Sequence, residues 1–161
     1  MNGFFRIVCR DATGAVKWAE SGPNMVHNEG EQYLLQAAFS EEQTPPANFY
    51  VGLDDRAALA EDDVLTDLSN EPSGDGYARQ PVASDNVDVT VALDSGDYKA
   101  TFKEVTFTAS GGTWNSVRNL FFCTVVSGTA GKLIASRALS QARVVADGES
   151  LDVQYWLKIS E

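Results

Sequence analysis

The residues that could perform hydrolytic or metal-dependent chemistry are sparse in this sequence. His27 is the single histidine, and residues 24–28 around it hold no Ser or Cys at the spacing of a catalytic triad. Hydrolytic triads and most metal sites use His as a base or a ligand. No phosphate-binding Gly-x-x-x-x-Gly-Lys-Ser/Thr run is present, and no Gly-x-Gly-x-x-Gly run follows a strand-like segment. We therefore expect His27 to pack in a turn.

Carboxylates are far more common, with 23 Asp and Glu residues in the chain. Two carboxylates in a cleft can hydrolyse a glycosidic bond, so a hydrolase is one alternative, but with so many acids some close pair is inevitable. Residues 61–63 and 94–97 could supply oxygen ligands for calcium, yet neither matches the twelve-residue loop of a helix-loop-helix site. We predict that the protein is not an enzyme and has no catalytic, cofactor-binding or metal-binding residues.

Aromatic side chains are the better candidates for binding. Tryptophan can stack on a sugar ring or fill a protein interface, although burial in a core is its more common fate. Trp156 shares a polar strand face with Asp152, Gln154 and Lys158, so we expect it to be exposed in the monomer unless a helix or a neighbouring subunit covers it. The N-terminal hairpin is predicted to be either core or contact surface. The candidate interface residues are Phe4, Phe5, Trp18, Trp114 and Trp156.

Composition limits the classes of partner. With 161 residues, 43% of them hydrophobic, the chain fits a single domain over residues 1–161. A net charge of −11 argues against nucleic acid, because phosphate binding needs clustered Lys and Arg. No apolar run approaches the roughly 20 residues of a membrane span, and the N-terminus lacks a signal peptide's features, so we expect cytoplasmic synthesis and no membrane partner. Cys9 and Cys123 are predicted to be buried free thiols, with a disulfide left open.

The clearest element is the final strand, residues 151–160. Leu151, Val153, Tyr155, Leu157 and Ile159 alternate with five largely polar positions. A period of two with one apolar face is typical of a half-buried strand, and a slip of one residue would turn that face to water. We therefore expect this strand to lie inside a sheet.

Two further elements are predicted at the N-terminus. Residues 3–10 and 15–20 form a hairpin around the turn 11–14, and residues 21–24 are expected to break the second strand. Asn28 is expected to cap a short helix over residues 29–39, with Glu29 and Glu31 in its first turn.

The rest of the chain reads as short strands between turns. Strands are predicted at residues 48–53, 77–82, 87–93, 98–108, 117–126, 132–139 and 143–146, the last as a short strand or a bend. Pro81 favours a sheet edge, and a bulge or a change of sheet is expected near residues 103–104. Residues 54–75 carry eight acids and are expected to be a solvated loop with one or two helical turns. The pattern predicts a mainly β fold, an antiparallel β-sandwich of the jelly-roll or immunoglobulin-like kind with one short helix.

Several segments together resemble a family of small structural proteins of tailed bacteriophages. These segments are residues 17–20, 24–30, 33–35, 49–53, 76–80, 131–134 and 138–139, with Val144, Gly148, Leu151 and Tyr155. The resemblance implies a virion component made in the host cytoplasm. It favours a capsid decoration (cement) protein that stabilises the head by binding the assembled shell. The alternatives are a tail, collar or fibre-associated protein and, with less support, a carbohydrate-binding module. The implied partners are the major capsid protein or other virion proteins, and further copies of the chain in a homo-oligomer.

Overall fold

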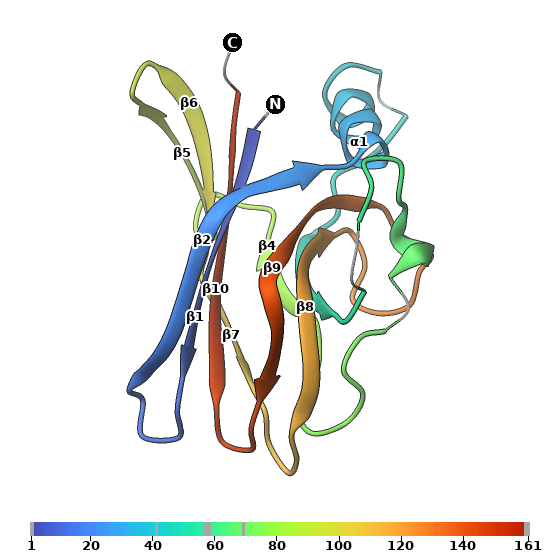
Figure 1. Cartoon of the computed structure of the whole chain (residues 1–161). Coiled ribbons are helices and arrows are strands. Elements are labelled where there is room, and N and C mark those ends of the chain that lie inside the picture. The colour runs from blue at the N-terminus through green and yellow to red at the C-terminus, as the bar shows by residue number, and fades with distance from the viewer. Residues whose placement is uncertain (1, 41, 57–58, 69, 160–161) are drawn as a thin grey trace.

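The computed structural model describes residues 2–40, 42–56, 59–68 and 70–159 (Figure 1). Its strands are all paired antiparallel. The strands are β1 (Asn2–Arg10), β2 (Val16–Val26), β3 (Asn48–Asp54), β4 (Gln80–Ala83), β5 (Val89–Asp94), β6 (Asp97–Phe102), β7 (Val105–Thr108), β8 (Trp114–Cys123), β9 (Leu133–Val145) and β10 (Ser150–Lys158). The helices are α1 (Asn28–Phe39) and a single 3-10 turn, η1 (Leu65–Asp67). In the described part of the chain, neither is long and apolar enough to cross a membrane.

All ten strands belong to one sheet, in the order β4-β3-β8-β9-β2-β1-β10-β6-β5, with β7 also paired to β10. β10 lies inside this sheet, as its alternation predicts, between β1 on one side and β6 and β7 on the other. Leu151, Val153 and Tyr155 are buried, whereas Ile159 lies beyond the strand and is exposed. The apolar face fixes the register over the strand proper.

The sheet bends back on itself through β2. Its first part pairs with β1 through Asn24, and Met25 and Val26 then pair with β9 (Figure 1). The predicted break at residues 21–24 is therefore wrong, because the strand continues through them. Pro23 is tolerated because this part of β2 has a ladder on only one side, so its missing N–H costs no bond to a second neighbour.

The bend divides the sheet into two halves: one holds β1, β5, β6, β7, β10 and the first part of β2, and the other holds β3, β4, β8, β9 and the end of β2. An aromatic-rich core lies between these halves. Tyr155 of β10 contacts Phe5 and Phe102 from its own half and Phe122 from the other, with ring centroids 4.6 to 4.9 Å apart. Phe49 stacks on Phe122 at 5.2 Å. Because β4 also lies against β7, the sheet nearly closes on itself.

The helix exists where the sequence predicts it, but its cap differs. His27, not Asn28, is the N-cap residue, and no side chain caps the first turn. Glu29 does lie in that turn, and its carboxylate accepts the N–H of Leu133 at 2.8 Å. Gly30 lets α1 pack directly on β9, because a Cβ there would lie 2.3 Å from the carbonyl oxygen of Ile134.

The remaining predictions mostly concern boundaries. The chain breaks between β6 and β7 at residues 103–104, where a bulge or change of sheet is predicted, and both strands pair with β10. Residues 143–145 are the end of the long β9 and not a separate strand. β4 is an edge strand, as Pro81 predicts. The mainly β, antiparallel fold with one α-helix is confirmed for the described residues. The β-sandwich of the jelly-roll or immunoglobulin-like kind stays a prediction, because all ten strands are hydrogen-bonded into one sheet, nine of them in one path and β7 beside β10.

Candidate functional site

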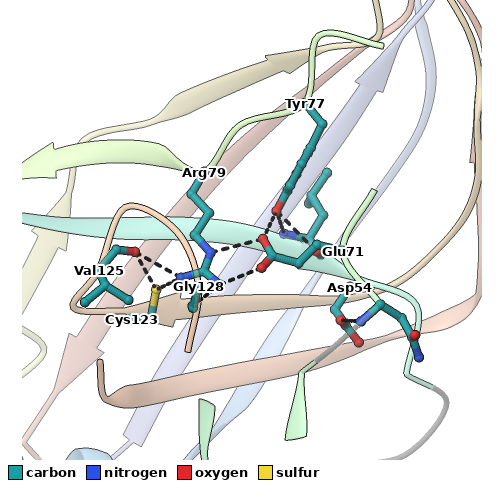
Figure 2. Close-up of polar contacts among 9 residues, drawn as sticks. Asp54, Glu71, Tyr77, Arg79, Cys123, Val125 and Gly128 are labelled. Carbon is teal, nitrogen blue, oxygen red and sulfur yellow. Dashed lines mark hydrogen bonds and ion pairs between the residues drawn. The ribbon is translucent and has the colours of Figure 1, made fainter. Parts of the chain in front are cut away.

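A connected group of polar side chains joins the segment between β3 and β4 to β3 and to the turn after β8 (Figure 2). Glu71 receives two hydrogen bonds from Arg79, at 2.5 Å and 3.0 Å, and lies 2.6 Å from the hydroxyl of Tyr77. That hydroxyl also accepts the N–H of Leu53 in β3 at 3.0 Å. Burial, then the nearby Glu71 carboxylate, raises the pKa of Tyr77, so its phenol stays protonated. The three side chains tie the segment to the start of β4.

Arg79 connects this group to the turn after β8. Its guanidinium donates to the carbonyls of Val125 at 3.0 Å and Gly128 at 2.9 Å, and lies 5.0 Å above the ring of Phe121. Its side chain is 2% exposed. Burial is the largest influence and opposes the charge, but the hydrogen bonds to Glu71 and the electrostatic attraction of Cys123, Glu71 and Tyr77 together outweigh it and raise the pKa of Arg79. A guanidinium satisfied on every side is a structural clamp and is not free to bind a ligand.

Cys123 lies beside this clamp, with its sulfur 3.5 Å from Arg79. Burial raises the pKa of the thiol. Because the thiolate is the reactive form, a raised pKa makes Cys123 a poor nucleophile. Cys9 and Cys123 are both free and buried, in agreement with the prediction.

Residues 54–75, called the acidic segment, include the end of β3 and most of the segment between β3 and β4. They are not simply a solvated loop, which corrects the prediction. Asp54 is fully buried, and its two carboxylate oxygens accept the N–H groups of Arg56 at 2.7 Å and Asn70 at 2.8 Å. Burial raises the pKa of Asp54 despite these bonds. Leu65 and Leu68 are also buried, in a second apolar cluster under the segment. The carboxylate therefore acts as a backbone anchor that holds both ends of an irregular loop.

His27 is also a structural residue of the interior. It is fully buried, and its Nε2 lies 2.7 Å from the hydroxyl of Ser136 in β9. Burial lowers the pKa of His27, so the neutral ring is favoured. It joins the start of α1 to β9, which extends the turn-packing role expected from sequence.

A polar groove of about 700 Å³ lies between the acidic segment and the start of β8. Its lining includes Asp55, Asn70, Asp75 and Asn115. Asp55 is already engaged, because Ser116 donates to it and Arg118 lies 2.9 Å away. Among the described residues, no group of three or more His, Cys, Asp or Glu side chains is arranged to hold a metal ion.

The five aromatic residues singled out from sequence fall into three places. Phe5 and Trp114 are core residues, 0% and 3% exposed, and are not available to a partner of the folded chain. Phe4 and Trp156 are cross-strand neighbours on the outer face of β1 and β10, half-buried and stacked with centroids 6.1 Å apart. Trp18 is half-buried under the guanidinium of Arg143, 4.5 Å from its ring. Phe4, Trp18 and Trp156 stay predicted interface residues.

The β5–β6 hairpin was not among the predicted sites, although it exposes more apolar surface than they do. Val91, Leu93 and Tyr98 are each 64–65% exposed. The alternation of valines over residues 87–93 indicated the strand. It did not indicate that the hairpin extends beyond the core, so that its apolar side chains have nothing to pack against. Burial on the apolar face depends on what lies opposite, which the strand's own sequence does not contain.

Residues 25–155 match the model of the family described as podophage GP4 fiber I protein gp80. This match runs from the end of β2 into β10 and covers most of the sheet. The chain therefore belongs to the podophage GP4 fiber I protein gp80 family, which places it among the structural components of phage virions. None of the curated proteins matches the chain.

Proposed function

We propose that the chain is a fibre-associated structural protein of the virion that works by contacts with other virion proteins and with its own copies. The family match over residues 25–155 carries this proposal, because the family's description names a fibre protein. It favours the tail-side alternative over the capsid decoration protein first expected from the resemblance, for which the match adds no support. The partners proposed are accordingly tail and fibre proteins rather than the major capsid protein.

The polar groups of the molecule support a role in binding rather than catalysis. Glu71 and Asp54 are fixed by donors on both of their oxygens, and His27 is held against Ser136 inside the protein. A general acid or base needs a side chain that can reach a substrate. These groups instead hold loops to the sheet. We also propose that the two facing halves form a flattened sandwich, because both contribute rings to one core.

The proposal is tested by locating the protein on particles of the phage that encodes it. We expect gold-labelled antibody against the purified chain to mark the tail region in electron micrographs. Label spread evenly over the head would instead favour the decoration protein, and so would binding of the purified chain to empty expanded shells. Particles without any label would contradict both.

A carbohydrate-binding module is the remaining alternative from the sequence. Trp114 is buried and cannot stack on a sugar, while Trp156 has Phe4 stacked on one face. We expect no change of tryptophan fluorescence when the chain is titrated with a panel of glycans. A saturable change that is lost in Trp156→Ala would favour the module.

A further inference from the structure

The β5–β6 hairpin carries an apolar surface that the rest of the chain leaves uncovered. β5 is the last strand of the sheet and pairs only with β6 among the described strands. Val91, Leu93 and Tyr98 are 65%, 65% and 64% exposed, and Val87 just before β5 is 82% exposed. In Figure 1 the hairpin projects beside the two chain ends, away from α1. A long apolar edge strand of this kind invites pairing or packing with another chain.

The exposed side chains lie on one face. Leu93 pairs with Tyr98 and Val91 with Ala100, and directly paired residues share a face of the sheet. Val89 continues the series and pairs with Phe102, a residue of the main core. This surface of Val91, Leu93 and Tyr98, called the hairpin face below, is therefore the core-facing side of the sheet, extended past the end of the core.

A groove adjoins the hairpin face. It has a volume of about 360 Å³, lies against Val89, Val91 and Phe102, and is bordered by Phe49 and residues 84–86. Its apolar lining is continuous with the hairpin face through Val91. The protein thus presents projecting apolar side chains and an apolar recess next to each other. A two-fold contact between copies needs this combination, because the same surface must supply both the projecting side chains and the recess that receives them.

The charges around the hairpin favour a second copy of the same chain as the partner. The chain carries a net charge of −11, so two copies repel each other over most of their surface. Around the hairpin, however, acids and bases are paired within the chain: Asp94 with Lys99 at 3.1 Å, Asp97 with Lys158 at 3.3 Å, and Asp88 with Lys103 at 3.3 Å. Asp85 at the groove has no ion pair among the described residues, but its carboxylate accepts the N–H groups of Val87 and Asp88, each at 2.9 Å. Two copies that meet at this face therefore bring few unpaired like charges together.

The exposed area agrees with a weak self-contact. Val87, Val91, Leu93 and Tyr98 together expose on the order of 500 Å² of side-chain surface, which is at the upper end for a monomer's largest apolar patch and below the roughly 800 Å² that each partner buries in a standard interface. We propose that the hairpin face is a contact between copies of this chain, in which Leu93 and Tyr98 of one copy enter the groove beside Val91 of the other. This rests on the proposed function for its role in the virion, but the contact itself can be measured on the purified chain.

The test begins with the oligomeric state of the full chain. Sedimentation velocity at roughly 1 to 500 µM should show a reversible, concentration-dependent dimer, since an interface of this size gives weak association. Raising the salt from roughly 0.05 to 0.5 M should strengthen the dimer, because salt screens the repulsion between two acidic copies and leaves the apolar contact. A chain that stays monomeric throughout overturns the proposal.

Two variants then locate the contact. Leu93→Lys places a charge on the hairpin face, and Ala92→Lys places the same charge one residue away on the opposite face of β5. We expect the first to weaken the dimer about tenfold or more and the second to change it little. If Leu93→Lys does not fold, judged by its circular dichroism, Leu93→Ser replaces it. A dimer unaffected by the Leu93 variant, or equally weakened by both, overturns the proposal.

The two proposals can fail separately. If antibody marks the tail but the purified chain stays monomeric, only the proposed self-contact is contradicted. If the chain dimerises through the hairpin face but antibody marks the head, only the proposed fibre-associated function is contradicted.

Discussion

The segment between β3 and β4 is irregular but buries several side chains, whereas the β5–β6 hairpin is regular but leaves its apolar side chains exposed. Between Asp54 and Gln80 the described chain forms only the turn η1, yet it buries Leu65, Leu68 and Arg79. The hairpin has an unbroken ladder of hydrogen bonds, yet Val91 and Leu93 face solvent. A regular ladder of backbone hydrogen bonds therefore does not by itself bury the side chains that it carries. The irregular segment is held by side chains that contact distant parts of the fold. Val91 and Leu93 of the hairpin are largely exposed instead, which is why we propose that a second copy covers them.

The largest expected effect is the loss of the Arg79 clamp. Arg79→Met removes the donor to the carbonyls of Val125 and Gly128 and leaves Glu71 with only the hydroxyl of Tyr77. Removing one partner of a buried ion pair costs about 3–5 kcal/mol in the free energy of unfolding. Urea denaturation followed by tryptophan fluorescence measures it.

A matched variant shows whether burial is the cause. Arg118→Met removes a pair with Asp55 whose arginine side chain is 44% exposed. Exposed pairs are worth about 0–1 kcal/mol, so this change should be nearly silent. Similar losses in the two variants would contradict the distinction between a buried clamp and a surface ion pair.

The same leucine substitution in the two regions gives the next contrast. Leu65→Ala opens a cavity under the irregular segment and should cost roughly 3 kcal/mol. Leu93→Ala in the regular hairpin should stay within about 0.5 kcal/mol, because its side chain is already in water. Both are measured by denaturation at a concentration where the chain is monomeric. Equal costs would mean that the hairpin is covered in the monomer.

The carboxylates of the two regions should respond to pH in opposite directions. Burial raises the pKa of Asp54, so its contribution to stability is greatest below the unfolded pKa and is lost as pH rises through the folded one. The hydrogen bond from Lys99 lowers the pKa of Asp94, so its contribution is present above the unfolded pKa and is lost as pH falls through the folded one.

Two amide variants measure these slopes. As pH falls from about 6 to 3, native stability should rise relative to Asp54→Asn and fall relative to Asp94→Asn. Denaturation at a series of pH values gives both differences. If the two stability differences changed with pH in the same direction, burial would not be what sets the pKa of Asp54.

The rate at which thiols are labelled should differ between the buried core and the exposed hairpin, and the cysteine variant used to measure it should hardly change the free energy of unfolding. Cys9 and Cys123 are buried, and burial raises the pKa of both thiols, so the native chain should react with a thiol reagent only after unfolding. Ala92→Cys adds an exposed thiol to the hairpin and should be labelled rapidly. Fast labelling of Cys123 in the unmodified chain would show that the segment packed against it through Leu65 and Leu68 opens readily.

Sequence patterns predicted the elements whose stability is local. The alternation of β10 fixed its faces and its interior place, and the polar turn at residues 11–14 fixed the first hairpin. The break predicted at residues 21–24 was wrong because Gly22 and Pro23 usually end a strand, and only the fold shows that β2 has one neighbour there. The helix cap was wrong for a related reason, since His27 is held by Ser136, 109 residues away.

The sequence alone determined that the chain is acidic, mainly β and antiparallel with one helix, because charge, period and turn residues are properties of neighbouring positions. The tertiary structure decided that Arg79 and Asp54 are interior clamps and that the hairpin face is bare. The burial of a side chain depends on what packs opposite it, and here the partners lie 46 and 49 positions from Arg79 and 16 positions from Asp54.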